Sequence, residues 1–564
     1  MGRNILASSL QNASFSIIFQ IFCRCITFAI NAFIVRNVGR DVLGITNVRL
    51  LLLESTLLFL SKEAIFRAAL SSKHNKQCNW AQLINQLWIT VPVCFVLSIP
   101  CLYVWLNWLS TVDDYYYVQY RFGCYAIAFA CVIELTAEPP IFISQVFCFV
   151  KLKVIMDTAH IFIRSCVFIT IVLWNKNITI YAFGIAQIIS AVTIIVGNYA
   201  FFYFYIPRLL RYRNELKRVD DKYELRKTFG NVYENMEDFP FNSIKDMVPG
   251  VLPNSNSPFN SDLQTLVFSF AKQGVLKQVL TEGEKYVMSI SPVLTFSEQA
   301  TYDVVNNMGS LAARFIFRPI EDSSYFYFTQ TIARDVTLSA QNRDKVKEAS
   351  LVLSYVCKTV TSIGLLGFVF GQSYSGTVLL LYGGMDFVEG GLPEVLLRWH
   401  CLAIVLLALN GITEGYMFAT NTSKEIDTYN YYMAFFSMAF LMLSYQLTNW
   451  IGPVGFILAN CSNMGFRISY SLYYIRNQYK EIGENPLRSF LPGPLFLSTL
   501  IGCGFICKIS ETYCRSMLYH VLVGALCTGT SLLTWSFENR QLLRAGLTRY
   551  RERKTSLTGE TTIG

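Results

Sequence analysis

The stretch ASFSIIFQIFCRCITFAINAFIV, residues 13–35, is long and apolar enough to cross a membrane as a helix, and Arg24 lies near its middle. A charged side chain at that depth is costly unless it faces a protein-lined, wet cavity. Other apolar stretches enclose cations in the same way: Arg164 in 155–174, Lys272 in 263–281, Arg314 in 300–320 and Arg467 in 453–475. We interpret these cations as evidence of a pathway for something anionic.

The composition of the chain also indicates a membrane protein. Of the 564 residues, 53% are apolar, 15% aromatic and only 15% charged, and the mean hydropathy is positive. A soluble domain with so few charges would disperse poorly in water. Clusters of polar residues divide the chain into about fourteen apolar segments of roughly 17 to 30 residues, which suits helices crossing a bilayer of about 30 Å. We therefore predict an all-α, polytopic membrane protein with about 14 transmembrane helices.

The orientation of the segments follows from the loops between them. Loops after even-numbered segments are the richer in lysine and arginine, for example Lys73 and Lys76 after the second and Lys151 and Lys153 after the fourth. Because short cytosolic loops carry the excess of positive charge, both termini are expected in the cytosol. We expect no cleavable signal peptide, because the first apolar stretch is long and is followed by Arg36 without a cleavage motif.

A polar stretch, residues 207–262, interrupts the apolar pattern, with roughly six segments before it and roughly eight after it. Its rich content of Pro, Asn and Ser predicts a cytosolic linker that is partly disordered. We predict an N-terminal lobe over 1–206 (helices 1–6), a C-terminal lobe over 263–480 (helices 7–12), a helical pair over 481–536 (helices 13 and 14) and a basic cytosolic tail over 537–564. Two lobes of this kind predict a transporter with its site between them.

Polar residues inside two segments recur at i, i+4, i+7 and i+11, the spacing that aligns them on one helix face. They are Gln20, Arg24, Thr27 and Asn31 in the first segment, and Asp303, Asn307, Ser310 and Arg314 in the eighth. A face of this kind suits a cleft between lobes and does not suit lipid. The alternative is a set of hydrogen bonds and ion pairs that lock the helices together, and Arg467 in the twelfth segment fits that alternative better.

Several other charged residues allow two interpretations. They either form structural pairs and hydrogen bonds or bind protons, cations or ligand: Arg49 with Glu54, Glu63 with Arg67, the run Asp157, His160 and Arg164, and the carboxylates Glu134 and Glu414. His400 and His520 stand alone without metal-ligand spacing. The sequence alone leaves each of these pairs of interpretations open.

Enzyme signatures are missing from the sequence. It has no P-loop, no GxGxxG after a strand, no HExxH and no GxSxG, and its 16 cysteines form no CxxC ladder. We therefore expect no covalent chemistry, no cofactor, no metal and no nucleic-acid partner.

Long strings along most of the chain resemble the eukaryotic Rft family of endoplasmic-reticulum membrane proteins. They are FCRCITFAINAFIVR (22–36), NVRL (47–50), FLSKEAIFRAAL (59–70), FVKLK (149–153), LKQVLTEGEKYVM (276–288), YDVVNNMGSLAARFIFRPIE (302–321), NGITEGY (410–416) and VGFILANCSNMGFRI (454–468). These strings include the costly intramembrane charges, which makes the resemblance specific.

The resemblance implies the multidrug/oligosaccharidyl-lipid/polysaccharide exporter fold, shared with the lipid II flippase MurJ and the MATE transporters. It also implies a role in N-glycosylation, in which a dolichol-diphosphate carrying five mannoses and two N-acetylglucosamines must reach the luminal leaflet. By analogy with lipid II flippases, Arg24, Arg49 and Arg314 would contact the headgroup. The family usually has arginine where this chain has Lys62 and Lys285, so that bidentate phosphate binding is in doubt at both places.

Three hypotheses follow from the residues and the resemblance together. The first is a glycolipid translocator whose expected site residues are Arg24, Asn31, Arg49, Lys62, Glu63, Lys272, Asp303, Asn307 and Arg314. The second is an accessory protein that binds the same lipid or organises glycosylation-machinery proteins without transport. The third is a small-molecule antiporter or a lipid-modifying enzyme. An antiporter for cationic drugs should have more acid than base in its cleft, and here the base predominates.

Overall fold

The structure is a computed structural model that describes residues 25–72, 79–109, 112–147, 149–216, 236, 239–252, 258–290, 294–334, 336–480, 482–484, 486–514 and 516–540. Arg24 lies outside these residues. The described residues form helices and no strand, which confirms the predicted all-α class. The chain divides into two compact units, Met1–Ala300 and Thr301–Gly564, which we call unit 1 and unit 2.

Unit 1 begins with a helix over Cys25–Asn37. The helices that follow are α2 (Arg40–Leu43), the π-helix η1 (Gly44–Leu50), α3 (Leu51–Ser72), α4 (Trp80–Trp88), α5 (Thr90–Asn107), α6 (Asp114–Glu134), the 3-10 turn η2 (Leu135–Ala137), α7 (Glu138–Val146), α8 (Val150–Trp174), η3 (Lys176–Ile178), α9 (Thr179–Leu216), η5 (Ile244–Met247) and α11 (Ser261–Ile290). The next helix, α12 (Phe296–Ala312), crosses the boundary between the two units.

Small residues bring the helices of unit 1 close together. Helix α3 packs against α11, and α9 packs against both α6 and α8. Gly184 on α9 faces Ala126 on α6, where an added Cβ would lie 2.9 Å from the alanine Cβ. Helices inside a membrane gain little from the hydrophobic effect, so that close van der Waals packing through such positions stabilises the bundle.

Part of the predicted linker is folded onto unit 1. The indole of Trp88 donates to the carbonyl oxygen of Met247 at 2.8 Å. The guanidinium of Arg213 donates to the carbonyl oxygen of Phe239 at 2.9 Å, and the buried rings of Phe239 and Phe241 join the aromatic core at this end of the unit. Residues 239–252 are therefore held by α4 and α9, while the lobe boundaries proposed from the sequence stay a prediction.

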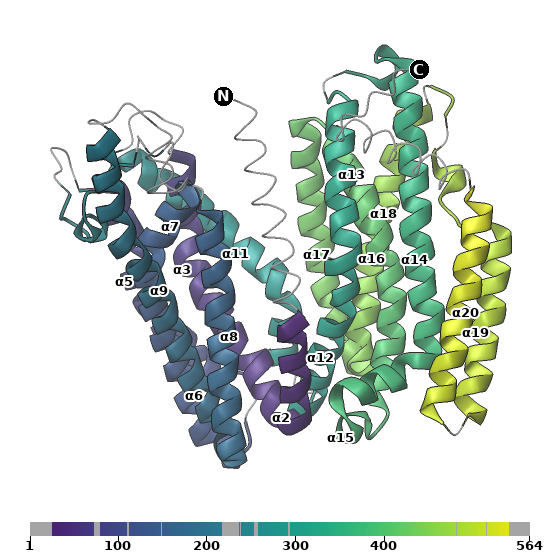
Figure 1. Ribbon diagram of the computed structural model, residues 1–564, viewed down its shortest axis with the longest axis horizontal. Coiled ribbons are helices and arrows are strands. Elements are labelled where there is room, and N and C mark those ends of the chain that lie inside the picture. The colour runs from purple at the N-terminus through teal and green to yellow at the C-terminus, as the bar shows by residue number, and fades with distance from the viewer. Residues whose placement is uncertain are drawn as a thin grey trace. The chain divides into compact units, whose positions relative to one another are not determined.

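Unit 2 continues from α12 through a second π-helix. Its elements are η6 (Ala313–Phe317), α13 (Arg318–Thr331), η7 (Leu338–Ala340), α14 (Arg343–Gly383), α15 (Met385–Val388), α16 (Leu392–Thr420), α17 (Ser423–Ile451), α18 (Val454–Lys480), η8 (Pro486–Ser489), α19 (Pro494–Tyr513) and α20 (Met517–Glu538). Helix α16 packs against α13, α14 and α18, so that it lies at the centre of the unit 2 bundle (Figure 1).

Local sequence signals set the ends of these helices. The side chain of Asn342 caps the start of α14, and Thr422 with Glu425 forms a capping box at the start of α17. Gly384 and Gly452 end α14 and α17 at φ values of 81° and 73°, which favour glycine. Within the described residues, nine helical stretches are long and apolar enough to span a membrane, and the full count of about 14 helices stays a prediction.

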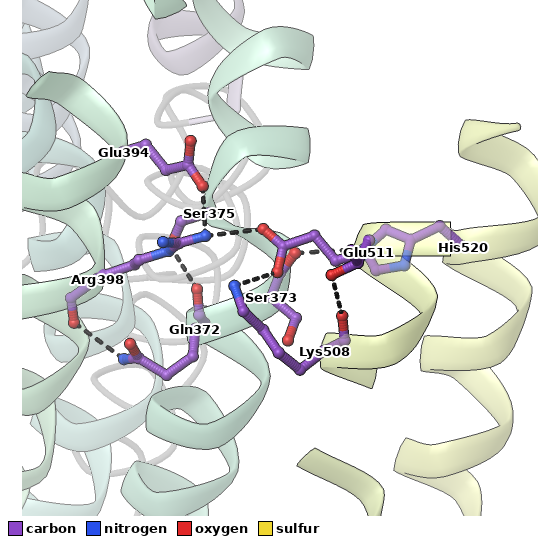
Figure 2. A network of polar contacts seen from close by, with 10 residues as sticks. Gln372, Ser373, Ser375, Glu394, Arg398, Lys508, Glu511 and His520 are labelled. Carbon is purple, nitrogen blue, oxygen red and sulfur yellow. Dashed lines mark hydrogen bonds and ion pairs between the residues drawn. The ribbon is translucent and has the colours of Figure 1, made fainter. Parts of the chain in front are cut away.

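The hairpin of α19 and α20 is attached to the rest of unit 2 mainly through α14. At one end, Arg398 on α16 pairs with Glu394 at 2.5 Å and with Glu511 on α19 at 2.7 Å, as Figure 2 shows. Nearby, the His520 ring stacks on Tyr374 with a centroid distance of 4.1 Å. At the other end, the indole of Trp535 donates to the Ser362 hydroxyl at 3.0 Å. Polar contacts thus hold both ends of the hairpin.

Candidate functional site

The span Asp114–Val146 is broken in its interior. The 3-10 turn η2 separates α6 from α7, and the pair Pro139 and Pro140 follows it. Pro140 has no N–H to donate to the carbonyl of Thr136 four residues earlier, and the Tyr199 hydroxyl on α9 donates to that carbonyl instead, at 2.9 Å. The break places two carboxylates, Glu134 at the end of α6 and Glu138 at the start of α7, on either side of one turn.

These carboxylates line a cavity of about 350 Å³ within unit 1. Helices α3, α6, α7, α8 and α9 all contribute side chains to it. The lining residues are Lys62, Glu63, Phe66, Glu134, Glu138, Ile141, Ser144, Gln145, Lys153, Met156, Asp157, His160, Ile194 and Asn198. Such a concentration of charge within helices long and apolar enough to span a membrane is costly, and it makes this cavity the candidate functional site of unit 1.

The charges in the cavity are partly paired. The Lys62 Nζ atom lies 3.8 Å from a carboxylate oxygen of Glu138. Glu63 pairs with Arg67 at 2.6 Å and with Lys277 of α11 at 3.7 Å. The pairing of Glu63 with Arg67 that the sequence allows is therefore present, and Glu63 also faces the cavity.

A column of polar side chains continues from the cavity between α8, α9 and α3. The His160 ring hydrogen-bonds the Ser190 hydroxyl at 3.1 Å. Arg164 donates to the side-chain oxygen of Gln187 at 3.2 Å and lies 3.9 Å from Glu54. Arg164 thus pairs with Glu54 on another helix.

A second set of polar contacts joins α3 to α11. The Ser55 hydroxyl donates to Glu282 at 3.1 Å, and the hydroxyls of Thr56 and Tyr286 lie 2.7 Å apart. Together with the pair between Glu63 and Lys277, these contacts fix α11 to the helix that carries Lys62. Any change of charge in the cavity therefore acts next to the α3–α11 interface.

The structure brings two of the nine sequence-predicted site residues, Lys62 and Glu63, into the cavity. Arg49 lies in η1, is fully buried, and has its guanidinium 5.3 Å from the centre of the Phe296 ring. In this conformation solvent does not reach it. Lys272 on α11 is exposed, with Nζ 4.6 Å from the centre of the Phe268 ring.

The other predicted site residues lie on the first helix and around α12. Asn31 is exposed on the helix over Cys25–Asn37. Asp303 on α12 is buried and accepts a hydrogen bond from exposed Asn307 at 3.1 Å. Arg314 lies in η6, but its side chain, like Arg24, lies outside what the structure describes. The role of all nine residues as substrate contacts stays a prediction.

Unit 2 contains a buried charge pair and an apolar cavity. Arg467 on α18 pairs with Glu414 on α16, which also accepts hydrogen bonds from the Tyr429 hydroxyl at 2.7 Å and from Asn410 at 3.1 Å. This network joins α16, α17 and α18, as the structural interpretation of Glu414 expects. A cavity of about 620 Å³ is lined by side chains of α12, α14, α16 and α20.

Sequence reasoning missed several residues of the unit 1 cavity. Glu138, Ser144, Gln145, Lys153 and Asn198 line it but were not predicted as site residues. The signal that could have found Glu138 is the run ELTAEPP, residues 134–140. Two glutamates four residues apart, followed by two prolines inside an apolar span, predict a broken helix with polar groups to satisfy.

Comparison with known proteins places these observations in a family. The model of the Rft protein family matches residues 8–549. The chain is 60% identical over 548 residues to the Man(5)GlcNAc(2)-PP-dolichol translocation protein RFT1 of Drosophila melanogaster, covering 96% of this chain and 98% of the relative. The protein of the same name from Mus musculus is 38% identical, with coverage of 94% and 95%.

Two solved structures share the fold. The lipid II flippase MurJ in an inward closed conformation has a TM-score of 0.53 at 12% sequence identity, covering 92% of this chain and 100% of the flippase. An inward-facing multidrug resistance MATE family transporter has a TM-score of 0.50 at 11% identity, covering 80% and 94%. At this identity the likeness concerns the fold alone, and it confirms the predicted MurJ-like and MATE-like architecture.

Proposed function

The chain belongs to the Rft family, and from this premise we propose that it translocates Man5GlcNAc2-PP-dolichol, a dolichol-diphosphate-linked oligosaccharide. The observation that carries the proposal is the 60% identity, over nearly the full length of both chains, to a relative named as a translocation protein for this lipid. We place the protein in the endoplasmic reticulum membrane with both termini in the cytosol. The lipid would move from the cytosolic to the luminal leaflet to supply protein N-glycosylation.

The physical demands of this task fit the molecule. A diphosphate and a chain of sugar hydroxyls cannot cross hydrocarbon alone, because polar groups buried without partners cost far more than thermal energy. Unit 1 offers a polar cavity with lysine, carboxylate, serine and amide side chains. Unit 2 offers an apolar cavity. Moving the lipid breaks and forms no covalent bond, so that a transporter without covalent chemistry is sufficient.

We keep the predicted lobes, 1–206 and 263–480, as the parts that alternately close around the lipid. Arg24, Arg49, Lys272 and Arg314 would hold the diphosphate, with Asn31 and Asn307 available for sugar hydroxyls. In the conformation described here Arg49 is buried, so the proposal requires a second conformation in which its guanidinium becomes accessible. The alternative is an accessory protein of the same pathway that binds the lipid or organises proteins of the glycosylation machinery without transporting the lipid itself.

Reconstitution tests the proposal directly. Purified protein is placed in liposomes that contain the labelled dolichol-diphosphate heptasaccharide, and the lipid moved between leaflets is measured for wild type, Arg24→Ala and the control Arg121→Ala. Arg121 is an exposed arginine on α6. Its replacement removes the same single positive charge as Arg24→Ala and should leave the fold intact. We expect protein-dependent movement that Arg24→Ala abolishes and Arg121→Ala leaves intact. Binding of the lipid without any movement would instead identify an accessory protein.

A further inference from the structure

The unit 1 cavity contains a buried carboxylate whose bonding is incomplete. Glu138 is 2% exposed and makes no hydrogen bond to any residue that the structure describes. The nearest ammonium group, Lys62 Nζ, is 3.8 Å away. Glu138 thus has one long ion pair in a buried position, where an incompletely compensated charge is costly.

Two other carboxylates in the cavity lack partners altogether. Glu134 and Asp157 have neither an ion pair nor a hydrogen bond to the residues in the described ranges. Glu63, in contrast, is paired with both Arg67 and Lys277. With Glu63 paired elsewhere, the two ammonium groups of the lining, Lys62 and Lys153, face three carboxylates, Glu134, Glu138 and Asp157. One negative charge is therefore left over.

Charged and titratable groups from several helices surround Glu134. Its charged and titratable neighbours are Glu54, Lys62 and Glu63 on α3, Cys94 on α5, Cys131 on α6, Glu138 on α7, and Lys153, Asp157, His160 and Arg164 on α8, while α9 adds only the uncharged Ile194 and Asn198 to the lining. Arg164 is already paired with Glu54. Lys62 is therefore the main cation near Glu134, and it is already the ion-pair partner of Glu138.

The residues of the cavity favour a proton over a metal ion as the species that compensates its excess negative charge. Across the described residues, no group of three or more His, Cys, Asp or Glu side chains is placed to hold a metal ion. Two ammonium groups in the same cavity would also repel a metal cation. A proton needs only one carboxylate oxygen, and its binding to partly buried Glu134 or to exposed Asp157 removes the uncompensated charge beside buried Glu138.

We propose that the unit 1 cavity is a proton-binding site in which Glu134 and Asp157 take up and release one proton, and that this exchange controls the position of α11. The proposal goes beyond the proposed translocation, because it assigns a source of energy and a moving element. It requires only association and dissociation of a proton from a carboxylate oxygen, and no other bond changes.

The link from the proton to α11 runs through Lys62 and Glu63. When Glu134 is neutral, Lys62 is attracted chiefly to Glu138, its ion-pair partner. When Glu134 is charged, Lys62 is attracted to both carboxylates, which flank the turn η2. Lys62 is adjacent to Glu63, whose pair with Lys277 joins α3 to α11. A shift of Lys62 between these two arrangements therefore acts on the α3–α11 contact.

The first test measures protonation without relying on lipid movement. Full-length protein in lipid bilayers is titrated between about pH 4 and about pH 9 by infrared difference spectroscopy of the protonated carboxyl band. Wild type, Glu134→Gln, Asp157→Asn and the control Glu484→Gln are compared, where Glu484 is a loop carboxylate 4.0 Å from Lys347. We expect a titrating band in wild type and in the control that is reduced in Glu134→Gln and in Asp157→Asn.

The second test measures coupling. Lipid movement in liposomes is followed with and without a proton gradient for wild type, Glu134→Gln and Glu484→Gln. We expect the gradient to change the rate for wild type and the control and to have no effect on Glu134→Gln. The absence of a titrating band that depends on Glu134 or Asp157 would overturn the proton site. If the titrating band is present but even the wild-type protein moves no lipid, the proposed translocation is rejected and the proton site stands.

Discussion

The hydroxyl of Tyr199 donates a hydrogen bond to the carbonyl oxygen of Thr136 at 2.9 Å, across the contact between α9 and the break in the span Asp114–Val146. The bond replaces the helical hydrogen bond that Pro140 cannot make. Because the acceptor lies inside the protein, the tyrosine hydroxyl stabilises the broken helix against a straight one. The cavity carboxylates Glu134 and Glu138 owe their positions to this arrangement.

We expect Tyr199→Phe to lower the free energy of unfolding by about 1 kcal/mol, because it leaves the carbonyl of Thr136 without a donor. The matched control is the same change in a Pro140→Ala background, where the new N–H can serve that carbonyl. Thermal unfolding in detergent measures both. An equal loss in the two backgrounds would contradict the assignment.

Gly44→Ala is expected to destabilise unit 1 by about 1 to 3 kcal/mol. An added Cβ at Gly44 would overlap the backbone carbonyl group of Phe296, and backbone atoms cannot move aside as a side chain can. Gly39→Ala is the control, since nothing lies within 4 Å of its added Cβ. The comparison of the two unfolding temperatures tests the packing of η1, and a Gly44→Ala protein as stable as the control would refute it.

Arg467→Met should destabilise unit 2 by about 3 kcal/mol, because it leaves the buried carboxylate of Glu414 without its cation. The double variant Glu414→Gln with Arg467→Met should regain part of the loss, since a neutral amide can keep the hydrogen bond from Tyr429. Unfolding of the single and double variants forms a thermodynamic cycle. A double variant less stable than Arg467→Met alone would exclude a charge pair.

Arg398→Met is expected to loosen the α19–α20 hairpin, because Arg398 is the residue that joins Glu511 of α19 to α16 (Figure 2). Hydrogen exchange should become faster in α19 and stay unchanged in α17, which lies elsewhere in the bundle. Lys508→Met is the control, because Lys508 pairs with Glu511 from the same helix. Equal exchange in the two variants would show that the Arg398 pair does not hold the hairpin.

The sequence was sufficient for the class of fold, and the reason is physical. Long apolar segments separated by charged loops have few stable solutions other than a helical membrane protein. The pairing of Glu63 with Arg67 was also accessible, because i, i+4 neighbours on a helix meet whatever the tertiary structure. Contacts of this local kind can be inferred from spacing alone.

The site was harder to predict, because it depends on which helices meet. Arg164 shares a helix face with Asp157, yet it pairs with Glu54 on α3, and no spacing rule reports that contact. Arg49 was expected to face a cleft and is buried beside Phe296 in this conformation. Glu138 and Asn198 line the cavity because α7 and α9 pack beside α3 and α8. Hydropathy does not specify which helices pack together.

Each of the two π-helices contains an arginine, and each determines the direction in which the side chains that follow it point. A π turn holds one residue more than an α turn, so η1, which contains Arg49, and η6, which contains Arg314, each act as a one-residue insertion within a helix. Deleting a single residue from Gly44–Leu50 would turn every side chain beyond it by about 100° around the helix axis. The length of these segments is therefore as constrained as their chemistry, and a change in length there would misdirect residues that are themselves unaltered.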